Sequence, residues 1–474
     1  MKKTKKLTAL LLVMAMVLSL GACGGGDKKD NQGSGNGDAA QNKDAENSGG
    51  TSEDGGEATD KVANGEDVKV EILQYKVEIE EALEGAIEKY QKLYPNVTIK
   101  LETIGGNDSV DTMYKARAAS GNMPDIFNCA GPVSCALYEP YLEDLSDQPW
   151  VQYANSGMLD LNTIDGKIYG MPVTTEGMGL IVNKEMFAAA GVDVATLDSF
   201  DKIEEAFNTL QTAIDNGDLK DTYPDLENVA SVQGGASWVL GNHGINICLS
   251  PEFEEDVFAC SKAEKVEFNY ADAYQAYTEL QLKYSAAKDD YKQALSVDYN
   301  TAVQELLATG KVACIQQGNW IYGDVKAIDQ TIADSLVYIP APIKGYKEDC
   351  IFSIVSNYWC VNKQSDDNVK EAAKHFLNWL YQSEEGKEIV VNKFGFTPVF
   401  NNYGDLKPSD PLTQNMVEYF EKGKGIPVVF QGCPDGEDYT MNVFGAKVQG
   451  VLSGSLTWDQ VFEESKAEWE QRKG

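Results

Sequence analysis

The side chains that most often bind metals, phosphates and carboxylates are scarce in this sequence. It has two histidines, His243 and His375, and two arginines, Arg117 and Arg472. Histidine is the commonest ligand of transition metals, and arginine is the favoured partner of planar anions. Their scarcity disfavours a metal centre and an anionic ligand, and it favours a neutral small ligand with no cofactor.

Positive charge is also in short supply. The chain of 474 residues has 40 Lys+Arg against 74 Asp+Glu, a formal net charge of −34. A nucleic-acid phosphate backbone requires a basic surface, so we expect no nucleic-acid partner. A hydrophobic content of 43% is enough for a large core, and the length predicts roughly two to four domains.

Common catalytic motifs are missing. We find no GxSxG, no P-loop, no GxGxxG after a strand, no HExxH and no CxxC. A Ser-His-Asp triad would need His243 or His375, and we expect structural roles for both. A pair of carboxylates suited to glycoside hydrolysis stays open, because 74 acidic residues offer many pairs.

The N-terminus has the pattern of a secretory signal. Lysines at positions 2, 3, 5 and 6 precede an apolar run from Leu7 to Leu20. That run is shorter than the ~20 residues that cross a bilayer. It ends in Leu20-Gly21-Ala22-Cys23, which resembles a bacterial lipoprotein box. The resemblance implies that residues 1–22 are a lipoprotein signal peptide and that Cys23 becomes the lipid-bearing first mature residue.

A low-complexity segment follows. From Gly24 to Lys61 the chain has no Val, Ile, Leu, Met or aromatic residue, and Gly, Asp, Asn, Glu and Ser dominate. Such a composition buries too little apolar surface to offset the entropy of ordering. We therefore expect residues 23–66 to be a disordered tether between the membrane and a folded body.

The folded body alternates strand and helix patterns. Val68 to Ile72 alternates apolar and polar residues, Ile79 to Leu93 has helical periodicity, and Val97 to Leu101 alternates again. A strand, helix and strand in this order predict a parallel βαβ unit, and therefore an α/β fold. Further predicted elements are strands at 312–316, 337–339 and 359–361 and a helix at 367–381.

Eight cysteines remain once Cys23 is set aside. An oxidising exterior permits disulfides, and Cys129/Cys135 and Cys248/Cys260 are close enough in sequence to pair. All eight are equally compatible with buried thiols, so both alternatives stay open.

Aromatic and amide residues stand where strands of the folded body end. Tyr75 follows the first strand, and Gln317 and Trp320 follow the strand at 312–316. Ligands of open α/β sheets bind beyond the carboxyl ends of strands, where aromatic faces can stack on sugar rings. Trp238, after Gly234-Gly235, and the pair Asn357-Tyr358 are further candidates, whereas Trp359 is expected in the core.

These residues lie within a family resemblance. The stretch from Gly166 to Val173, continuing to Phe187, resembles extracellular solute-binding proteins of carbohydrate ABC transporters, the family of the maltose-binding protein. The motifs Met123-Pro124-Asp125-Ile126-Phe127, Gly310 to Trp320 and Asn378 to Pro398 follow in the order of that family. The resemblance covers essentially all of residues 67–474.

The resemblance implies two lobes, each with a mainly parallel sheet flanked by helices, and three crossing segments. We expect crossings near 173–176, 336–341 and 378–383. One lobe would hold residues 67–173 and 337–378, and the other 174–336 and 379–474. The implied protein is a monomer, lipid-anchored at the cell surface, which captures a neutral carbohydrate and delivers it to permease subunits.

Eight residues are expected to bind the ligand, with Trp320 as a stacking surface and Glu176 as a hydroxyl acceptor. They are Tyr75, Asn128, Glu176, Trp238, Gln317, Trp320, Asn357 and Tyr358. Two departures from the family's pattern, Asn128-Cys129-Ala130-Gly131 and the bulky Asn357-Tyr358-Trp359, argue against a malto-oligosaccharide. A surface glycoside hydrolase and a binding lipoprotein for a non-sugar solute are the alternatives.

Overall fold

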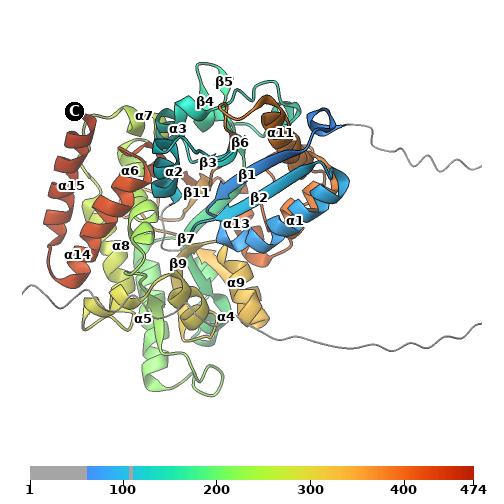
Figure 1. Ribbon diagram of the computed structural model, residues 1–474. Coiled ribbons are helices and arrows are strands. Elements are labelled where there is room, and N and C mark those ends of the chain that lie inside the picture. Colours follow the sequence, from blue (N-terminus) through green and yellow to red (C-terminus); the bar gives the residue numbers. More distant parts are fainter. Residues whose placement is uncertain (1–60, 106–109) are drawn as a thin grey trace, which may run out of the picture. The chain divides into compact units, whose positions relative to one another are not determined.

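Two β-sheets organise the residues that the computed structural model describes, 61–105 and 110–474 (Figure 1). The first sheet has the strand order β2-β1-β3-β12-β6. The second has the order β13-β11-β7-β9-β8, with β10 paired to β7. We call each sheet, with the helices packed on it, a lobe.

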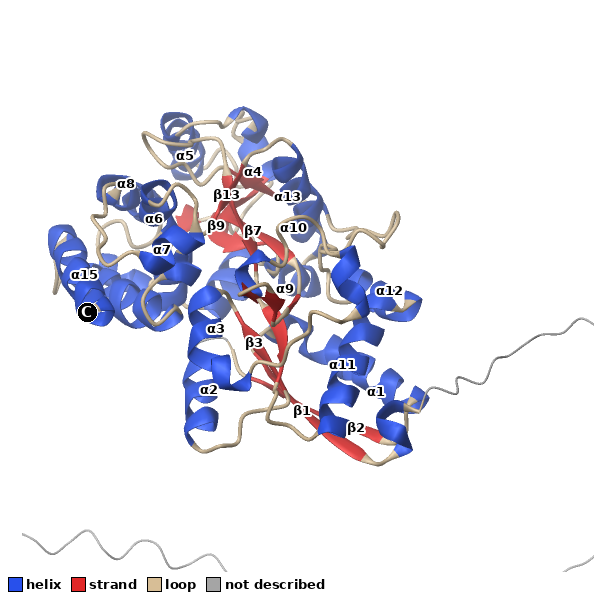
Figure 2. Ribbon diagram, turned by 90° about the horizontal axis from the view of Figure 1, so that it is seen from above, coloured by secondary structure: helices blue, strands red, loops and turns tan. Residues whose placement is uncertain are grey.

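The first lobe contains the predicted βαβ unit. Strand β1 (Val68–Gln74) pairs in parallel with β2 (Val97–Thr103), and α1 (Glu80–Leu93) connects them. Alternation along β1 sends Val70 and Ile72 to a core with α1 and α11, and Leu73 to a second core with α2 and α3. Figure 2 shows these helix pairs on opposite sides of the sheet. The other elements are β3 (Ile126–Cys129), β6 (Met171–Pro172), β12 (Tyr358–Val361), α2 (Val110–Ala119), α3 (Pro132–Tyr138), α11 (Asp367–Gln382) and α12 (Glu384–Asn392), with a small sheet of β4 (Thr163–Ile164) and β5 (Lys167–Ile168).

The second lobe is built around β7 (Thr175–Asn183), whose residues from Glu176 to Asn183 are buried. Its other strands are β8 (Asn228–Ser231), β9 (Val312–Gly318), β10 (Leu336–Ile339), β11 (Ile351–Val355) and β13 (Gly425–Pro427). Its helices are α4 (Lys184–Ala189), α5 (Phe200–Asn216), α6 (Asn246–Glu252), α7 (Val257–Lys262), α8 (Ala271–Lys283), α9 (Ile321–Ile328), α10 (Gln330–Asp334), α13 (Pro411–Glu421), α14 (Ala446–Ser453) and α15 (Trp458–Lys473).

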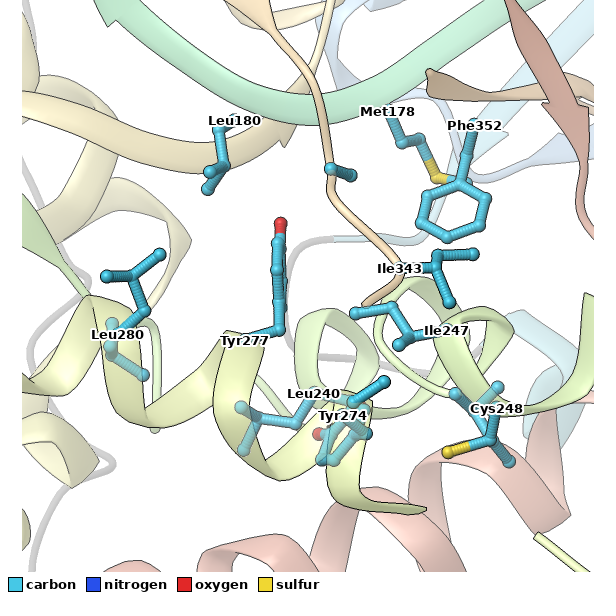
Figure 3. Packing of buried hydrophobic residues seen from close by; sticks show 14 of the residues in the cluster. Met178, Leu180, Leu240, Ile247, Cys248, Tyr274, Tyr277, Leu280, Ile343 and Phe352 are labelled. Carbon is cyan, nitrogen blue, oxygen red and sulfur yellow. Dashed lines mark hydrogen bonds between the residues drawn. The ribbon is translucent and has the colours of Figure 1, made fainter. Parts of the chain in front are cut away.

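The two faces of β7 belong to different hydrophobic cores. Met178, Leu180 and Val182 join the larger core, and Ile181 joins the smaller core on the opposite face. Figure 3 shows Leu180 near Tyr277 of α8 and Met178 beside Phe352 of β11 within the larger core. Burying each such Leu or Met side chain stabilises the fold by roughly 1.5–3 kcal/mol. This packing fixes β7, which also contributes to the cleft described below.

The α/β class is confirmed, but the strand pairing is more mixed than expected. In the second lobe, β7 runs antiparallel to β9, β10 and β11, and the parallel pairs are β8–β9 and β11–β13. Sequence periodicity identifies a strand but not the direction of its partner, because buried parallel and antiparallel strands share the same apolar pattern.

The second and third crossings lie later in the chain than the expected positions near 336–341 and 378–383. Strands β10 and β11 both pair with β7, whereas β12 pairs with β3, so the chain crosses at Ser356–Asn357. Helices α11 and α12, with Phe400 and Tyr403, pack in the first lobe, and α13 packs in the second. The third crossing therefore falls between Tyr403 and α13. Local sequence patterns predict these helices and strands, but the lobe to which each belongs depends on the elements that it contacts in the tertiary structure.

The folded body also begins earlier than the expected end of the tether at residue 66. A short 3₁₀ segment, η1 (Val62–Gly65), buries Val62 and Ala63 against the first lobe. The Ala63 N–H donates to Glu371 Oε1 at 3.1 Å. The predicted signal peptide, Cys23 and the tether up to residue 60 lie outside the described residues. No helix in the described part has the length and hydropathy needed to cross a membrane.

The eight cysteines of the described part are all free thiols, and all are buried. Cys129, Cys135 and Cys360 share one core of the first lobe. The large core of the second lobe contains the other five: Cys248, Cys260, Cys314, Cys350 and Cys433. Of the two alternatives left open by the sequence, the structure has the buried thiols.

Candidate functional site

A cavity of about 180 Å³ lies between the two lobes, and we call it the cleft. The first lobe contributes the segment from Tyr75 to Glu78, which follows β1. The second lobe contributes residues from β7, from the end of β9 and from three short helical segments. The three segments are η7 (Val239–His243), η10 (Phe430–Gly432) and η11 (Asp438–Gly445). The cleft thus stands where both sheets end, which is where open α/β folds place ligands.

A smaller cavity of about 50 Å³ adjoins the cleft, and we call it the annex. Tyr75, Val110, Phe430 and Glu437 line both cavities. The annex alone is lined by Asn128, Asn357, Asp111 and Gln431, among others.

Four of the eight expected ligand-binding residues line the cleft: Tyr75, Glu176, Trp238 and Trp320. Asn128 and Asn357 line the annex. Gln317 and Tyr358 are fully buried and lie outside the lining of both cavities. Trp359 is buried in the core of the first lobe, as expected.

Aromatic rings form one wall of the cleft. The ring of His243 lies 5.0 Å from that of Trp238 and 5.5 Å from that of Trp320, measured between centroids. Tyr299 lies 5.9 Å from Trp238 and extends the wall. Rings in such tilted and edge-to-face contacts hold one another in place. The wall therefore presents a preorganised apolar surface.

His243, for which the sequence favoured a purely structural role, is part of this wall. The amide of Gln316 donates to its Nδ1 at 2.9 Å, which makes Nδ1 the acceptor nitrogen. Burial lowers the pKa of His243 to about 3, so the imidazole is neutral at physiological pH. His243 therefore contributes an uncharged ring to the cleft.

Hydrogen bonds and a close approach fix the position of Trp320. Its indole N–H donates to Gln317 Oε1 at 3.0 Å, and the amide of Gln317 donates to Gln233 Oε1 at 2.7 Å. A Cβ on Gly318 would stand 2.0 Å from the Trp320 ring. Glycine at 318 is thus required for the ring to lie back over the end of β9, and Gln317 supports the wall from behind.

A buried ion pair joins the lobes at the cleft. Lys76 Nζ lies 2.5 Å from Glu176 Oε1 and 3.1 Å from Glu78 Oε1. Burial alone would lower the pKa of Lys76, but the two carboxylates raise it above its ordinary value, so the ammonium stays charged. One cation thus faces two carboxylates, and this group carries one excess negative charge.

Several polar groups at the two cavities have no partner among the described residues. They are Trp238 Nε1 at the cleft, and Asn128 Oδ1 and Asn357 Nδ2 at the annex. No hydrogen bond or ion pair from residues 61–105 and 110–474 reaches the carboxylate of Glu437. Burial and the charge of Asp111 raise the pKa of Glu437 to about 7, against the opposing effect of the Lys115 ammonium. Glu437 is half-buried, whereas the three other atoms are fully buried. Buried polar groups are normally satisfied, so these three atoms are the ones that a ligand would complete.

Sequence reasoning missed His243, Tyr299, Phe430, Glu437 and Met441 as lining residues. They come from irregular helical segments and not from strand ends. The segments η7 and η11 meet because Gly241 lets Thr440 approach: a Cβ there would stand 2.0 Å from the Thr440 carbonyl oxygen. The Thr440 hydroxyl also donates to Asn242. The glycine-rich Gly241-Asn242-His243-Gly244 was the available signal, since glycine permits such approaches.

Within residues 61–105 and 110–474, no three His, Cys, Asp or Glu side chains are grouped so as to hold a metal ion.

Residues 85–417 match the family of bacterial extracellular solute-binding proteins. A xylose/arabinose-binding protein from Haloferax volcanii is 25% identical over 56% of this chain and 56% of its own length. A maltooligosaccharide ABC transporter solute-binding lipoprotein from Streptococcus pneumoniae is 22% identical over 76% of this chain and 81% of its own length. This chain thus spans about half of the first relative and most of the second.

Solved structures share the fold. A sugar transporter from Bacillus licheniformis in complex with stachyose superposes with a TM-score of 0.66 at 18% identity, over 85% of this chain and 100% of that one. A chitin oligosaccharide binding protein superposes with a TM-score of 0.66 at 22% identity, over 86% of this chain and 99% of that one. The two-lobed α/β fold implied by the sequence is confirmed.

Proposed function

Because this chain belongs to the bacterial extracellular solute-binding protein family, we propose that it captures a sugar between its two lobes and delivers it to the permease of an ABC transporter. Family membership also decides between receptor and enzyme. The chain is a solute-binding protein and not a glycoside hydrolase.

The aromatic wall is the observation that carries the sugar assignment. Trp238 and Trp320 both pack on the ring of His243 in a cavity between the lobes. Flat rings of this kind stack on the C–H faces of a pyranose, and nearby amides and carboxylates accept its hydroxyls. The relatives whose names include xylose, arabinose and maltooligosaccharide support the same ligand class.

Charge in the cleft argues against an acidic sugar. Among the described residues, Lys76 is the one cation that lines the cleft. Glu176 and Glu78 already pair with it. Arg117 pairs with Glu71 and Glu102, and Arg472 with Asp435, Asp438 and Glu468. A buried carboxylate or phosphate of a ligand would therefore lack the charged partner that it needs.

We propose that ligand binding favours the state in which the lobes are in contact. The Gln431 amide donates to Ala130 O across the lobes, and Lys76 pairs with Glu176 at the cleft. A sugar that touches both lobes would add contacts to this state alone. A change from mostly open to mostly closed requires a differential affinity of ~5 kcal/mol. The closed state would then dock on the permease as a monomer.

The anchoring proposal concerns residues outside the described part. We propose that residues 1–22 are removed as a signal peptide and that lipid on Cys23 holds the protein at the outer face of the cytoplasmic membrane. The printed name of the Streptococcus pneumoniae relative includes the word lipoprotein, which supports this proposal. Changing Cys23→Ala should move the protein from the membrane fraction to the medium. Retention of the variant in the membrane would contradict a lipid anchor.

Calorimetry tests the sugar assignment. The protein is titrated with mono- and disaccharides, sugar acids, amino acids and short peptides, and each mixture is then analysed for products. We expect binding of a sugar without turnover. Trp320→Ala should weaken that binding by ~1–3 kcal/mol, the loss of one stacking ring. Trp458→Ala is the matched control, because Trp458 is also partly buried but packs on Tyr274 of the second lobe, away from the cleft. Binding of peptides or amino acids without any sugar would overturn the assignment.

A further inference from the structure

We propose that the sugar held in this cleft is an amino sugar, whose ammonium group enters the annex beside Glu437. This inference rests on the proposed function and specifies its ligand. It replaces the expected neutral ligand with one that carries a single positive charge.

The annex has the size for a substituent and not for a ring. Its volume is about 50 Å³, against about 180 Å³ for the cleft. The ring of a sugar therefore belongs in the larger cavity, and a polar substituent of that ring belongs in the annex. Tyr75 and Phe430 line both cavities, so a ring in the cleft and its substituent in the annex would touch the same two side chains.

Acceptors dominate the annex. Asn128 is 5% exposed and its Oδ1 has no partner, because its amide nitrogen is the atom that faces the Tyr358 carbonyl. The carboxylate of Glu437 is also without a partner from the described residues. One donor without a partner, Asn357 Nδ2, faces the same space. An ammonium group has three donors and no acceptor, so it satisfies Asn128 and Glu437 together, whereas a hydroxyl has one hydrogen to donate.

The other carboxylates of the annex are already paired. Asp111 accepts from Tyr138 and pairs with Lys115 at 2.8 Å, and Asp435 pairs with Arg472 at 3.1 Å. Glu437 is the remaining one. Lys115, the cation that acts on Glu437 electrostatically, is paired with Asp111, and Lys76, a cation of the cleft lining, is held by Glu176 and Glu78. A cationic group of the ligand would supply the charge that Glu437 lacks.

The raised pKa of Glu437 is consistent with this arrangement. A carboxyl that titrates near 7 in the free protein is poorly compensated, and a cation placed against it stabilises its charged form. The free energy that burial costs Glu437 is thus recovered when an ammonium binds.

Calorimetry at constant pH tests the proposal with three matched ligands: a 2-amino-2-deoxyhexose or its disaccharide, the parent sugar with a hydroxyl at that position, and the N-acetylated sugar. We expect the amino sugar to bind about tenfold or more tightly than either of the others, the effect of one charge-assisted contact. Glu437→Gln should bring the affinity ratio of amino sugar to parent sugar close to one. Asp438→Asn is the control, because Asp438 adjoins Glu437 in sequence but pairs with Arg472 at 2.7 Å and does not line either cavity.

The outcomes separate the two proposals. If the parent or the N-acetylated sugar binds as well as the amino sugar, the ammonium inference is overturned and the sugar-binding function stands. If Glu437→Gln keeps the full preference for the amino sugar, the assignment to the annex is overturned. If no sugar binds but a simple diamine does, both the inference and the proposed sugar function fail.

Discussion

Lys76 Nζ and Glu176 Oε1 lie 2.5 Å apart in a buried ion pair that joins the first lobe to the second at the edge of the cleft. Lys76 is 4% exposed and Glu176 is 5% exposed. Lys76 follows β1 of the first lobe. Glu176 is the second residue of β7, the strand that begins just after the chain first crosses to the second lobe. A buried charge is tolerated only when it is paired, so each side chain fixes the position of the other.

A double-mutant cycle on this pair should therefore show strong coupling. We expect Glu176→Gln to lower the free energy of unfolding by about 2 kcal/mol or more, because Lys76 then keeps only Glu78 as a charged partner. Adding Lys76→Met should cost less than the sum of the single changes, with a coupling of about 1–3 kcal/mol measured by urea denaturation. The exposed pair Lys89–Glu385, at 2.8 Å, is the control and should couple by less than about 1 kcal/mol. Equal coupling in both pairs would contradict the assigned role.

Gly318→Ala should disturb the aromatic wall. The added Cβ would stand 2.0 Å from the Trp320 ring, so the indole must leave its place over β9 and its bond to Gln317. We expect a loss of at least about 1 kcal/mol in ligand affinity, measured by calorimetry, and a change in tryptophan fluorescence. Gly323→Ala is the control, since nothing lies within 4 Å of a Cβ at that helical position. That change should raise stability by about 0.5–1 kcal/mol, because alanine favours helix. Ligand affinity that survives Gly318→Ala unchanged would remove Trp320 from the site.

Glu437 predicts a specific dependence of stability on pH. Its pKa rises from 4.5 to about 7 on folding because of burial, so the folded protein holds the proton more tightly than the unfolded chain. The resulting stabilisation is complete below pH 4.5 and is lost as the pH rises through 7. Relative to Glu437→Gln, the wild type should therefore lose free energy of unfolding between pH 5 and pH 8, by on the order of 2 kcal/mol.

Urea denaturation at four pH values between these limits measures that difference. Asp438→Asn provides the contrast. Partial burial acts to raise the pKa of Asp438, but hydrogen bonds from Arg472 and Asn442 lower it below 3.8. The effect of Asp438→Asn on the free energy of unfolding should not vary between pH 5 and pH 8, because the Asp438 carboxyl stays ionised in the folded and the unfolded state. If the difference in free energy of unfolding between the wild type and Glu437→Gln also does not change with pH, Glu437 is solvated and its charge is already compensated.

The eight buried cysteines should be inert in the folded protein. Burial raises the pKa of the Cys129 and Cys248 thiols well above the usual value, and the thiolate is the reactive form. In a Cys23→Ala chain, we expect a thiol reagent to titrate none of the eight within minutes in buffer and all eight in denaturant. Six or fewer reactive thiols in denaturant without reductant would reveal a disulfide. The Cys129/Cys135 pair would be examined first.

Much of the secondary structure could be predicted because local pattern decides it. The strand from Val68, the helix that ends at Leu93 and the strand from Val97 lie where their periodicity placed them. Partner choice was harder. Residues 336–339 are a strand, as expected, but they pair with β7 in the second lobe and do not mark a crossing. An apolar run has the same appearance whichever strand lies beside it.

Some residues of the candidate site could likewise be predicted from the sequence, and others could not. Tyr75 and Trp320 could be found because each follows a strand, and strand ends border the cleft. Gln317, three residues before Trp320, is fully buried, lines neither cavity and accepts the indole N–H of Trp320. Glu437 had no signal at all, being one acidic residue among 74.

The sequence by itself determined the class of this protein: an acidic α/β chain, poor in arginine and histidine, with the ordered motifs of a solute-binding family. These properties are sums over residues or local periodicities, and they need no knowledge of contacts. The tertiary structure alone decided which charges are neutralised. Lys76 is paired with Glu176, 100 positions away in sequence, whereas no hydrogen bond or ion pair from the described residues reaches the carboxylate of Glu437. Desolvation and pairing depend on distance in space, so the charge that the cleft presents to its ligand is set by folding.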